Sequence, residues 1–320
     1  MRRKAHRNYH HREKKRLGID IGGTSLKAGI VNEKNLEIEE MITAPTGPDL
    51  TCDDLVKLCS ECIEEFLEDY HFSEVGIGSP GPLDIREGLI YHTANFPKIE
   101  NCRLIPLLQV IHPNLKFALD NDANCAAYGY YYEMKKSGFE PDAECVITVG
   151  TGIGGGLIIN GKIFHGANDN AFEVGHMALA HPKLLEMVPE VLTCGCGKKY
   201  CFETYASATA VKKYYTALTG KTLDPPEIVD LANKGDANAK LVWDIAGYAV
   251  GLFAANLFYL LGARDLLVTG GLYGAHEHIV PKMHEAMDEN MSPRDLHLMD
   301  VVFASGENYY GVIGAAMLIR

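Results

Sequence analysis

Two segments of the sequence each have the pattern of a strand, a turn rich in glycine and threonine, and a second strand. The first is L-G-I-D-I-G-G-T-S-L-K-A-G-I-V from Leu17, and the second is V-I-T-V-G-T-G-I-G-G-G-L-I-I from Val146. Both patterns predict β-hairpins. Glycine turns expose backbone N–H groups that an anion can approach closely. Two such turns facing each other across a cleft would form a clamp for a polyphosphate, although neither is a Walker A sequence.

Helical and strand patterns alternate through the rest of the chain. Predicted strands lie at 116–119 and 265–269, and predicted helices at 53–70, 126–136, 205–218, 237–261 and 309–319. The strand at 265–269 ends in Gly270-Gly271, a third glycine turn, and Asn160-Gly161 is a strong two-residue hairpin turn. The alternation predicts an α/β fold, and a length of 320 residues favours two domains.

A compact set of cysteines follows a histidine near the middle of the chain. The segment E-V-G-H-M contains Glu173 and His176, and the segment C-G-C-G-K-K-Y-C-F-E contributes the remaining donors, which are Cys194, Cys196 and Cys201. Three thiolates and one imidazole form a complete tetrahedral donor set for structural Zn²⁺. Isolated cysteines are usually core residues, but a glycine-rich C-x-C-x4-C cluster argues against that interpretation. Glu173 and Glu203 flank these ligands, so two carboxylates would be held by the same metal-braced segment.

Polar residues also follow two predicted strands. The loop G-S-P-G-P-L-D, which includes Gly81, comes directly after a short strand, where small ligands are commonly bound. Asn121 and Asp122 lie where the strand at 116–119 leads into a helix. These two residues have a simpler interpretation as helix N-caps, and an isolated Asp-Asn-Asp would favour it.

Composition limits the classes of partner. A formal net charge of −12 argues against a general nucleic-acid or anionic-membrane binder. Nine cysteines without a signal peptide indicate a reducing cytoplasmic setting with metal binding, and not a disulfide framework. The longest apolar run, 249–263, is shorter than a membrane span. Residues 1–16 are basic and predict a disordered tail.

Taken together, these residues resemble the ROK family of bacterial sugar kinases, repressors and uncharacterised relatives. The resemblance rests on five motifs in order: D-I-G-G-T-S-L-K, G-S-P-G-P-L-D, N-D-A-N, G-T-G-I-G-G-G, and E-V-G-H followed by C-G-C-G-K-K-Y-C-F-E. It implies the two-lobed, actin-like or ribonuclease-H-like ATPase fold with a structural zinc site. Residues 17–122 with the C-terminal helix 308–320 would form the small lobe, and residues 123–307 the large lobe with the zinc motif.

The resemblance also implies roles for individual residues. The first phosphate loop would contain Asp20, Gly22, Gly23, Thr24 and Lys27, with Asp20 near Mg²⁺. The second phosphate loop would contain Thr151, Gly152, Gly154 and Gly155, and Gly270 and Gly271 would form the adenosine segment. The sugar would be bound by Gly81, Asn121, Asp122, Glu173, His176 and Glu203. Asp122 would be the catalytic base, and His176 would bind zinc with one nitrogen and a sugar hydroxyl with the other.

The activity implied is an ATP-dependent hexose kinase, with glucose as the leading substrate and glucose 6-phosphate as its product. N-acetylmannosamine, N-acetylglucosamine and fructose are alternative acceptors. A sugar-responsive regulator would need a DNA-binding domain that sixteen residues cannot form, and a non-catalytic sugar-binding protein would leave the phosphate loops without a purpose. The expected partners are ATP and a hexose, with no nucleic acid and no membrane, in a homodimer or a tetramer.

Two features depart from the family pattern. Tyr200 precedes Cys201 where the zinc motif usually has glycine, so the backbone there must avoid positive φ or tolerate its cost. The connection between His176 and Cys194 is extended and includes His181, Pro182 and Pro189.

Overall fold

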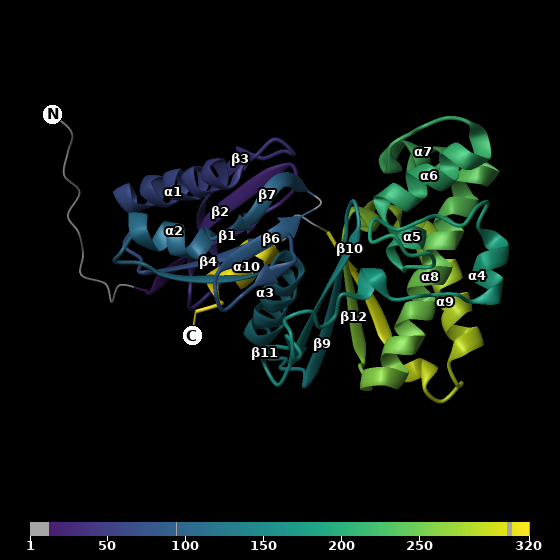
Figure 1. Ribbon diagram of the computed structural model, residues 1–320. Coiled ribbons are helices and arrows are strands. Elements are labelled where there is room, and N and C mark those ends of the chain that lie inside the picture. The colour runs from purple at the N-terminus through teal and green to yellow at the C-terminus, as the bar shows by residue number, and fades with distance from the viewer. Residues whose placement is uncertain (1–12, 94, 306–308, 320) are drawn as a thin grey trace. The chain divides into compact units, whose positions relative to one another are not determined.

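The computed structural model describes residues 13–93, 95–305 and 309–319 (Figure 1). Backbone contacts divide the chain into two compact units. Unit 1 contains residues 1–121 and 312–320, and unit 2 contains residues 122–311. The predicted α/β class is confirmed, because each unit has a five-stranded sheet with helices. The lobe boundaries inferred from the sequence stay a prediction.

The sheet of unit 1 has the order β3-β2-β1-β4-β8. Its strands are β1 (Lys15–Ile21), β2 (Ser25–Asn32), β3 (Ile38–Pro45), β4 (Glu74–Ser79) and β8 (Lys116–Asn121). Strands β1, β2 and β3 pair antiparallel, whereas β1, β4 and β8 pair parallel. The carboxyl ends of the three parallel strands therefore share one edge of the sheet, which is where open α/β sheets bind ligands.

Three helices and a small sheet complete unit 1. They are α1 (Cys52–Asp69), α2 (Leu104–Ile111), the C-terminal helix α10 (Tyr310–Ala316), which begins in unit 2, and the sheet of β5 (Leu83–Asp84), β6 (Leu89–Thr93) and β7 (Phe96–Cys102). Gly18 and Gly76 let α10 approach the large sheet. A β-carbon built on either glycine would lie within 2.0 Å of a carbonyl oxygen of that helix. Strands β5, β6 and β7 were not among the predicted strands.

The sheet of unit 2 has the order β11-β10-β9-β12-β13 and repeats the directions found in unit 1. Its strands are β9 (Ala143–Val149), β10 (Ile153–Ile159), β11 (Lys162–Ile163), β12 (Asp265–Gly270) and β13 (Asp300–Ala304). Its helices are α3 (Asp122–Lys136), η1 (Val174–His176), α4 (Pro182–Met187), α5 (Glu203–Ala206), α6 (Ala208–Thr219), α7 (Pro225–Asn233), α8 (Ala237–Leu261), η2 (Gly271–Ala275), α9 (His276–Asn290) and η3 (Leu296–Leu298).

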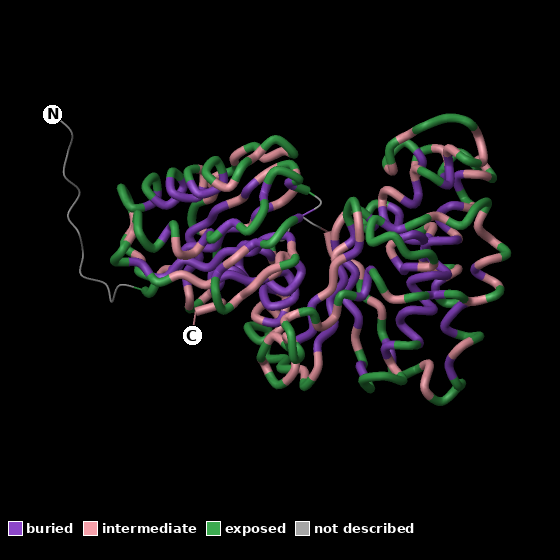
Figure 2. Tube along the Cα trace, viewed as in Figure 1, coloured by how far each residue is buried: buried purple, intermediate pink, exposed green. Residues whose placement is uncertain are grey.

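Helix α8 is the apolar centre of unit 2, and its path is mostly buried in Figure 2. By length and composition alone this 25-residue helix could cross a membrane. The apolar run 249–263, which was considered in the sequence, is too short to indicate this. However, 78% of its most apolar window is buried within the protein. Gly247 and Gly251 allow this close packing, since β-carbons there would lie 2.3 and 2.1 Å from the carbonyl oxygens of Ile279 and Met283 on α9. The helix packs as a core element.

Two sequence predictions about local structure are wrong. The predicted tail 1–16 ends too late, because Lys15 and Arg16 belong to β1, while residues 1–12 lie outside the described part of the chain. Arg16 is buried and pairs with Glu33 and Glu74, so its charge is compensated inside the fold. The predicted helix 205–218 is two helices, α5 and α6. Ser207 interrupts it with an extended backbone and accepts a hydrogen bond from Ala210 N as the cap of α6.

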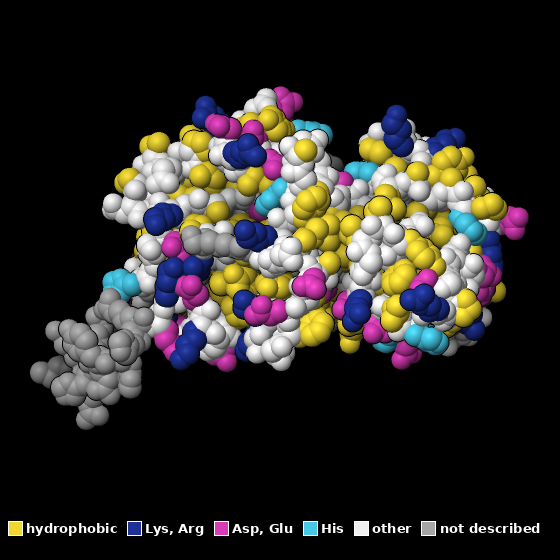
Figure 3. Space-filling model, turned by 90° about the horizontal axis from the view of Figure 1, so that it is seen from below, with side chains coloured by type: hydrophobic (Ala, Val, Ile, Leu, Met, Phe, Trp, Pro, Cys, Tyr) yellow, Lys and Arg dark blue, Asp and Glu magenta, His cyan; other side chains and the backbone are white. Residues whose placement is uncertain are grey.

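On the face seen in Figure 3, both units carry positive and negative side chains, and Lys and Arg lie among Asp and Glu. Acidic residues outnumber basic ones, 42 to 30, in the whole sequence. The molecule therefore presents mixed charge on that face and not a continuous basic surface.

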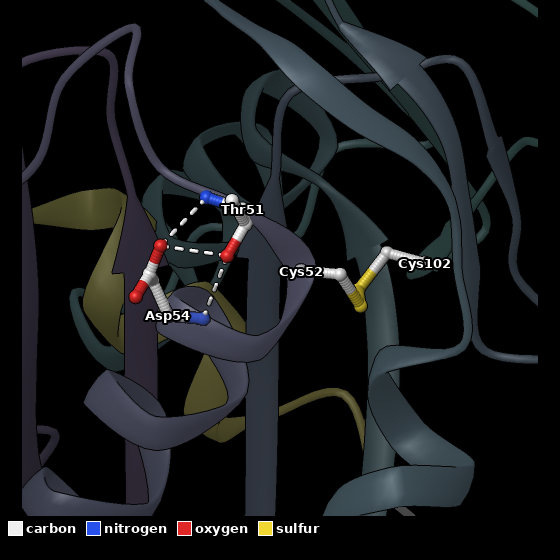
Figure 4. The surroundings of a disulfide bond; sticks show 4 residues. All are labelled: Thr51, Cys52, Asp54 and Cys102. Carbon is white, nitrogen blue, oxygen red and sulfur yellow. Dashed lines mark hydrogen bonds between the residues drawn. A yellow bond between two sulfur atoms is a disulfide. The ribbon is translucent and has the colours of Figure 1, made fainter.

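The sequence predicted free or metal-binding cysteines and no disulfide framework, but the structure contains a disulfide bond. Cys52, the first residue of α1, forms a disulfide with Cys102, the last residue of β7 (Figure 4). The other seven cysteines are free. One covalent link between two distant segments was not predictable from cysteine spacing, because the two residues are separated by 50 positions.

Candidate functional site

In unit 1, the predicted first phosphate loop is a tight turn between β1 and β2. Gly22 N donates to Ser25 O over 2.9 Å, and Thr46 fixes the turn through Gly22 O, at 2.6 Å, and Thr24 O, at 3.1 Å. Asp20 and Lys27 occupy paired positions on the two strands just below this turn. The structure therefore brings together the predicted residues Asp20, Gly22, Gly23, Thr24 and Lys27.

Two further predicted residues lie at the same sheet edge. Asn121 ends β8 and is paired with Ser79, the last residue of β4. Gly81 lies two residues after Ser79, and a β-carbon built on Gly81 would lie 3.7 Å from Asn121 Nδ2. Gly81 and Asn121, which were predicted to contact a sugar, are thus neighbours.

Asn95 lies in the turn between β6 and β7, and the sequence motifs assign it no role of its own. Its side chain lies 3.3 Å from the β-carbon position of Gly23. No sequence motif places it near the first glycine turn. It comes close to that turn because β6 and β7 fold into the small sheet.

In unit 2, the turn of the second hairpin comprises Gly150, Thr151 and Gly152. Gly150 N donates to Gly152 O over 3.0 Å, and the start of α6 contacts the turn through Ala208 N to Gly150 O, at 2.9 Å, and Thr209 Oγ1 to Thr151 O, at 2.7 Å. The contacts from α6 hold the turn from outside, a support that the sequence motifs did not reveal.

The prediction that Gly154 and Gly155 belong to this turn is wrong, because both residues lie within β10. A β-carbon on Gly154 would lie 2.9 Å from Ala123 Cβ, and one on Gly155 would lie 2.7 Å from Phe172 O. These glycines allow neighbouring segments to approach the strand. Their assignment to cofactor binding stays a prediction.

The third glycine turn lies beside the end of β9. Gly270 pairs with Val149 across the sheet and has φ 99°, and a β-carbon there would lie 2.4 Å from Val149 O. Only glycine fits such a position. Gly271 begins η2 and lies against the same carbonyl group. Gly270 and Gly271 therefore neighbour the turn that contains Thr151 and Gly152.

Asp122 is the first residue of α3, whose next residue, Ala123, packs on β10. Its Oδ1 accepts a hydrogen bond from Ala123 N over 2.8 Å. Withdrawal from water raises the pKa of Asp122 to about 6, the hydrogen bond from Ala123 opposes this rise, and the negative charge of Glu173 adds to it. A carboxylate with such a pKa is suited to accept a proton near neutral pH.

Glu173 and His176 lie on an exposed short segment that is fixed from below. His176 N donates to Glu173 O over 3.1 Å, which closes η1. Gly175 sits directly on β10, where a β-carbon would lie only 2.1 Å from Ile153 O. The segment is therefore positioned by the same hairpin that carries the second glycine turn.

The donor atoms of His176, Cys194, Cys196 and Cys201 all lie within 4.8 Å of one another. His176 Nδ1 lies 3.5 Å from Cys194 Sγ, and the Sγ atoms of Cys196 and Cys201 are 3.7 Å apart. Tetrahedral zinc with ordinary Zn–S and Zn–N bonds separates its donors by about 3.5–3.8 Å. The donor set and its spacing are thus compatible with a structural zinc ion.

The loop that carries these cysteines tolerates an unfavourable backbone conformation. Tyr200 has φ 66°, so the residue that replaces the usual glycine adopts the left-handed conformation. Tyr200 O accepts a hydrogen bond from Leu179 N over 2.7 Å, and the next residue bridges Ala178. These contacts hold the tyrosine in place and offset its cost.

Glu203 connects the cysteine cluster to the second glycine turn. Its Oε1 lies 2.7 Å from Cys194 Sγ, while its Oε2 lies 2.8 Å from the β-carbon position of Gly152. One carboxylate thus contacts the candidate zinc site and the predicted phosphate loop. Asp122, Glu173, Glu203 and Gly270 thus all lie on segments that adjoin β9, β10 or the turn between them.

Comparison with known proteins identifies related chains. The ROK family profile matches residues 16–320. The glucokinase of Thermotoga maritima is 29% identical over 96% of this chain and 97% of its own length. The N-acetyl-D-glucosamine kinase of Aliivibrio fischeri is 34% identical over 80% of this chain and 83% of its own length. Among solved structures, a ROK family glucokinase from Streptomyces griseus, in complex with glucose and AMPPNP, is 26% identical. It has a TM-score of 0.74 and covers 95% of this chain and 98% of its own.

Proposed function

Because the chain belongs to the ROK family and has the fold of its sugar kinases, we propose that it transfers the γ-phosphoryl group of ATP to a hexose hydroxyl, with glucose as the preferred acceptor. The relatives named glucokinase match nearly the whole chain, and the solved relative binds glucose and an ATP analogue. The proposal includes a cytoplasmic location and a homodimer, with a tetramer as the alternative.

Asp122 is the proposed catalytic base. A sugar hydroxyl is a weak nucleophile, so a carboxylate within hydrogen-bond reach must accept its proton as it attacks the γ-phosphorus. The raised pKa of Asp122 makes it a better base than an ordinary aspartate while leaving it mostly ionised at pH 7. Gly81, Asn121, Glu173, His176 and Glu203 are the proposed hydroxyl-binding residues, since their groups supply both donors and acceptors.

The glycine turns are the proposed nucleotide-binding residues. Gly22, Gly23 and Thr24, with Thr151 and Gly152, would donate backbone or hydroxyl groups to phosphate oxygens, and Gly270 and Gly271 would lie against the adenosine. Asp20 and Lys27 provide charges below the first turn. Mg²⁺ bound with ATP would neutralise charge on the phosphates, and Asp20 is its proposed protein contact.

Zinc is the proposed ion for His176, Cys194, Cys196 and Cys201. With four protein ligands the ion leaves no position for water, so its contribution would be rigidity and not chemistry. Because His176 directs Nδ1 toward Cys194, its Nε2 is the atom proposed to meet a sugar hydroxyl. The observation that carries this proposal is the position of Glu203 between Cys194 and Gly152.

A panel of acceptors tests the function. Release of ADP from Mg-ATP is measured with glucose, N-acetylglucosamine, N-acetylmannosamine and fructose, and the highest kcat/KM is expected for glucose. The second candidate is N-acetylglucosamine, which is favoured by the 34% identity to a kinase of that name. A higher kcat/KM for an N-acetylated sugar would replace glucose as the substrate, and acceptor-independent ADP release alone would refute the kinase assignment.

A further inference from the structure

The disulfide between Cys52 and Cys102 lies outside the site described above. It joins the amino end of α1 to the carboxyl end of β7, two segments whose Cα atoms at the bridge are 5.4 Å apart (Figure 4). Cys102 is 1% exposed, while Cys52 is half-buried beside the N-cap residue Thr51. Cys102 is thus enclosed by the core of unit 1, whereas Cys52 packs against that core and is the more exposed residue of the pair.

The bridge holds one end of the sheet formed by β5, β6 and β7, which we call the flap (residues 83–93 and 95–102). The flap begins two residues after Gly81, and Tyr91 N donates to Pro82 O over 3.0 Å, so its root is attached to the predicted sugar loop. In the turn between β6 and β7, the side chain of Asn95 lies 3.3 Å from the β-carbon position of Gly23 in the first glycine turn. The position of the flap therefore bears on two predicted binding segments of unit 1.

Noncovalent contacts also hold the flap. Ile90, Phe96 and Ile99 are fully buried in the core that includes α1. Because these buried contacts do not depend on a covalent bond, we expect reduction to loosen the flap and not to unfold unit 1. The bond is thus one restraint on the flap in addition to these buried contacts.

We propose that Cys52 and Cys102 form a reversible thiol–disulfide switch whose oxidised form restrains the flap and whose reduced form releases it. Restraint of the flap in unit 1 follows from the contacts above. Its effect on sugar binding rests on the proposed function, because Gly81 is a proposed hydroxyl-binding residue.

The exchange balances with a small-molecule disulfide as the oxidant. The Cys52 thiolate attacks one sulfur of the oxidant, which forms a mixed disulfide and releases one thiolate. The Cys102 sulfur, after losing its proton, then attacks Cys52 Sγ and releases the second thiolate. Two cysteine thiols are oxidised, one external disulfide is reduced to two thiols, and both protons pass to the released thiolates.

The other free cysteines are poor competitors for this exchange. Cys59, Cys62, Cys125 and Cys145 are buried, and burial raises the pKa of the Cys62 thiol to about 11 and that of Cys145 to about 12. The remaining three belong to the candidate zinc cluster. Outside that cluster, Cys52 is therefore the one described cysteine that is not buried.

Hydrogen exchange of the intact protein tests the switch without reference to kinase activity. The protein is equilibrated with oxidised or reduced glutathione, and the Cys52–Cys102 bond is followed by peptide mapping. Amide exchange in peptides covering 83–102 is expected to be at least about 3-fold faster in the reduced protein. The variant Cys52→Ser should exchange like the reduced form under both conditions, and Cys102→Ala serves as the second variant.

Two controls isolate the bond. Thr51→Ala removes the N-cap of α1 but keeps both cysteines, so its flap should still respond to glutathione. Zinc content is measured in every sample, because oxidation of the cysteine cluster would otherwise mimic the switch. Equal flap exchange in oxidised and reduced wild-type protein, or a bond that cannot be reduced without denaturation, would overturn the proposal.

Kinetics then address the sugar site. The KM for the preferred hexose is expected to differ by at least about 2-fold between oxidised and reduced wild-type protein, and not in Cys52→Ser. If no hexose is phosphorylated, the proposed function fails while the exchange measurement still decides the switch. A changed flap with an unchanged KM would confine the switch to unit 1 and refute its link to sugar binding.

Discussion

Asp122 is the residue on which the proposed chemistry depends most. Replacing it with asparagine keeps the size of the side chain and an oxygen that can accept the hydrogen bond from Ala123 N, but removes the proton acceptor. We expect Asp122→Asn to lower kcat by about 10²–10⁴-fold while leaving the hexose Kd within about 3-fold. Steady-state ADP release and calorimetric binding measure the two quantities. A variant with near-normal kcat would place the base elsewhere.

The pH dependence of the reaction reports on the same carboxylate. A general base must be ionised, so a pKa of about 6 predicts that kcat/KM falls about tenfold per unit as the pH drops below about 6 and is constant above it. Initial rates measured over this range at constant ionic strength provide the check, with thermal unfolding followed in parallel to exclude loss of folded protein. A profile that stays flat to about pH 5 would contradict the assignment.

Glu144 is a buried acid of β9 that the reaction does not use. Its carboxylate oxygens have no hydrogen-bond partner among the described residues, and burial, with the nearby charge of Asp265, raises the pKa of Glu144 to about 8. The folded state thus holds a proton that the unfolded state releases above about pH 4.5. Stability must therefore decline as the pH rises from about 4.5 to about 8, by up to about 1.4 kcal/mol per unit from this group.

The variant Glu144→Gln should remove this decline. Urea unfolding at several pH values in that range compares it with wild type and with Glu186→Gln, a matched change at an exposed carboxylate. We expect the Glu144→Gln curve to be flatter than both others. Equal slopes for all three proteins would show that Glu144 is ionised in the folded state.

Among the elements, the loop from His176 to Cys201 shows how local irregularity can serve a site. The extended connection that departs from the family pattern contains α4, and Lys183 on that helix pairs with Glu285, at 2.6 Å, and with Glu289 on α9. Helix α4 thus attaches the loop to α9 through Lys183, and the bridge between Cys201 and Ala178 holds the two ends of the loop together. A zinc ion would complete a rigid support for Glu173 and Glu203.

Loss of one ligand should release that support. We expect Cys196→Ser to lower bound zinc to well below one ion per chain and to raise the KM for the hexose by roughly 10-fold, because the carboxylates lose their fixed positions. Elemental analysis and kinetics make the test. Cys125→Ala, a change at a buried cysteine outside the cluster, should keep the metal. Full zinc content in Cys196→Ser would refute the ligand assignment.

The elements also show what could be predicted from sequence. Hairpins with strong turn signals, such as Asn160-Gly161, were predictable because both turn residues need positive φ, and both have it. The role of Gly154 was not, because glycine in a turn and glycine under a packed helix look alike in a sequence. Ser207 was missed as a helix boundary for a similar reason, since its cap depends on one side-chain hydrogen bond.

Across the whole molecule, repetition carried the prediction. Both five-stranded sheets have the same order of parallel and antiparallel strand pairs. In each sheet a glycine-containing turn joins the two strands of the first hairpin. The sequence exposed this repeat through the similar motifs after Asp20 and Val149. The flap and the disulfide have no counterpart among the described residues of unit 2 and could not be predicted, because long-range pairing leaves little trace in local spacing.

Charge decides between catalysis and gene regulation at this scale. A regulator that neutralises several phosphates needs a clustered basic surface, whereas this chain has a formal net charge of −12. Its basic N-terminal segment spans residues 1–16, of which 1–12 lie outside the described part of the chain. We therefore expect no sequence-specific DNA binding at physiological salt. Any binding at low salt should fall steeply as salt rises and disappear when residues 1–12 are deleted.

Gel-shift titrations of the full chain and the deletion variant, with ADP release measured on the same samples, test this expectation. The deletion should leave kcat/KM within about 2-fold, because β1 begins at Lys15 and keeps the buried pairs of Arg16. Retained DNA affinity in the deletion variant would locate a basic site within the folded units. A local basic site would then bind DNA despite the negative net charge of the chain. That result would make the net charge a poor guide to the partners of this protein.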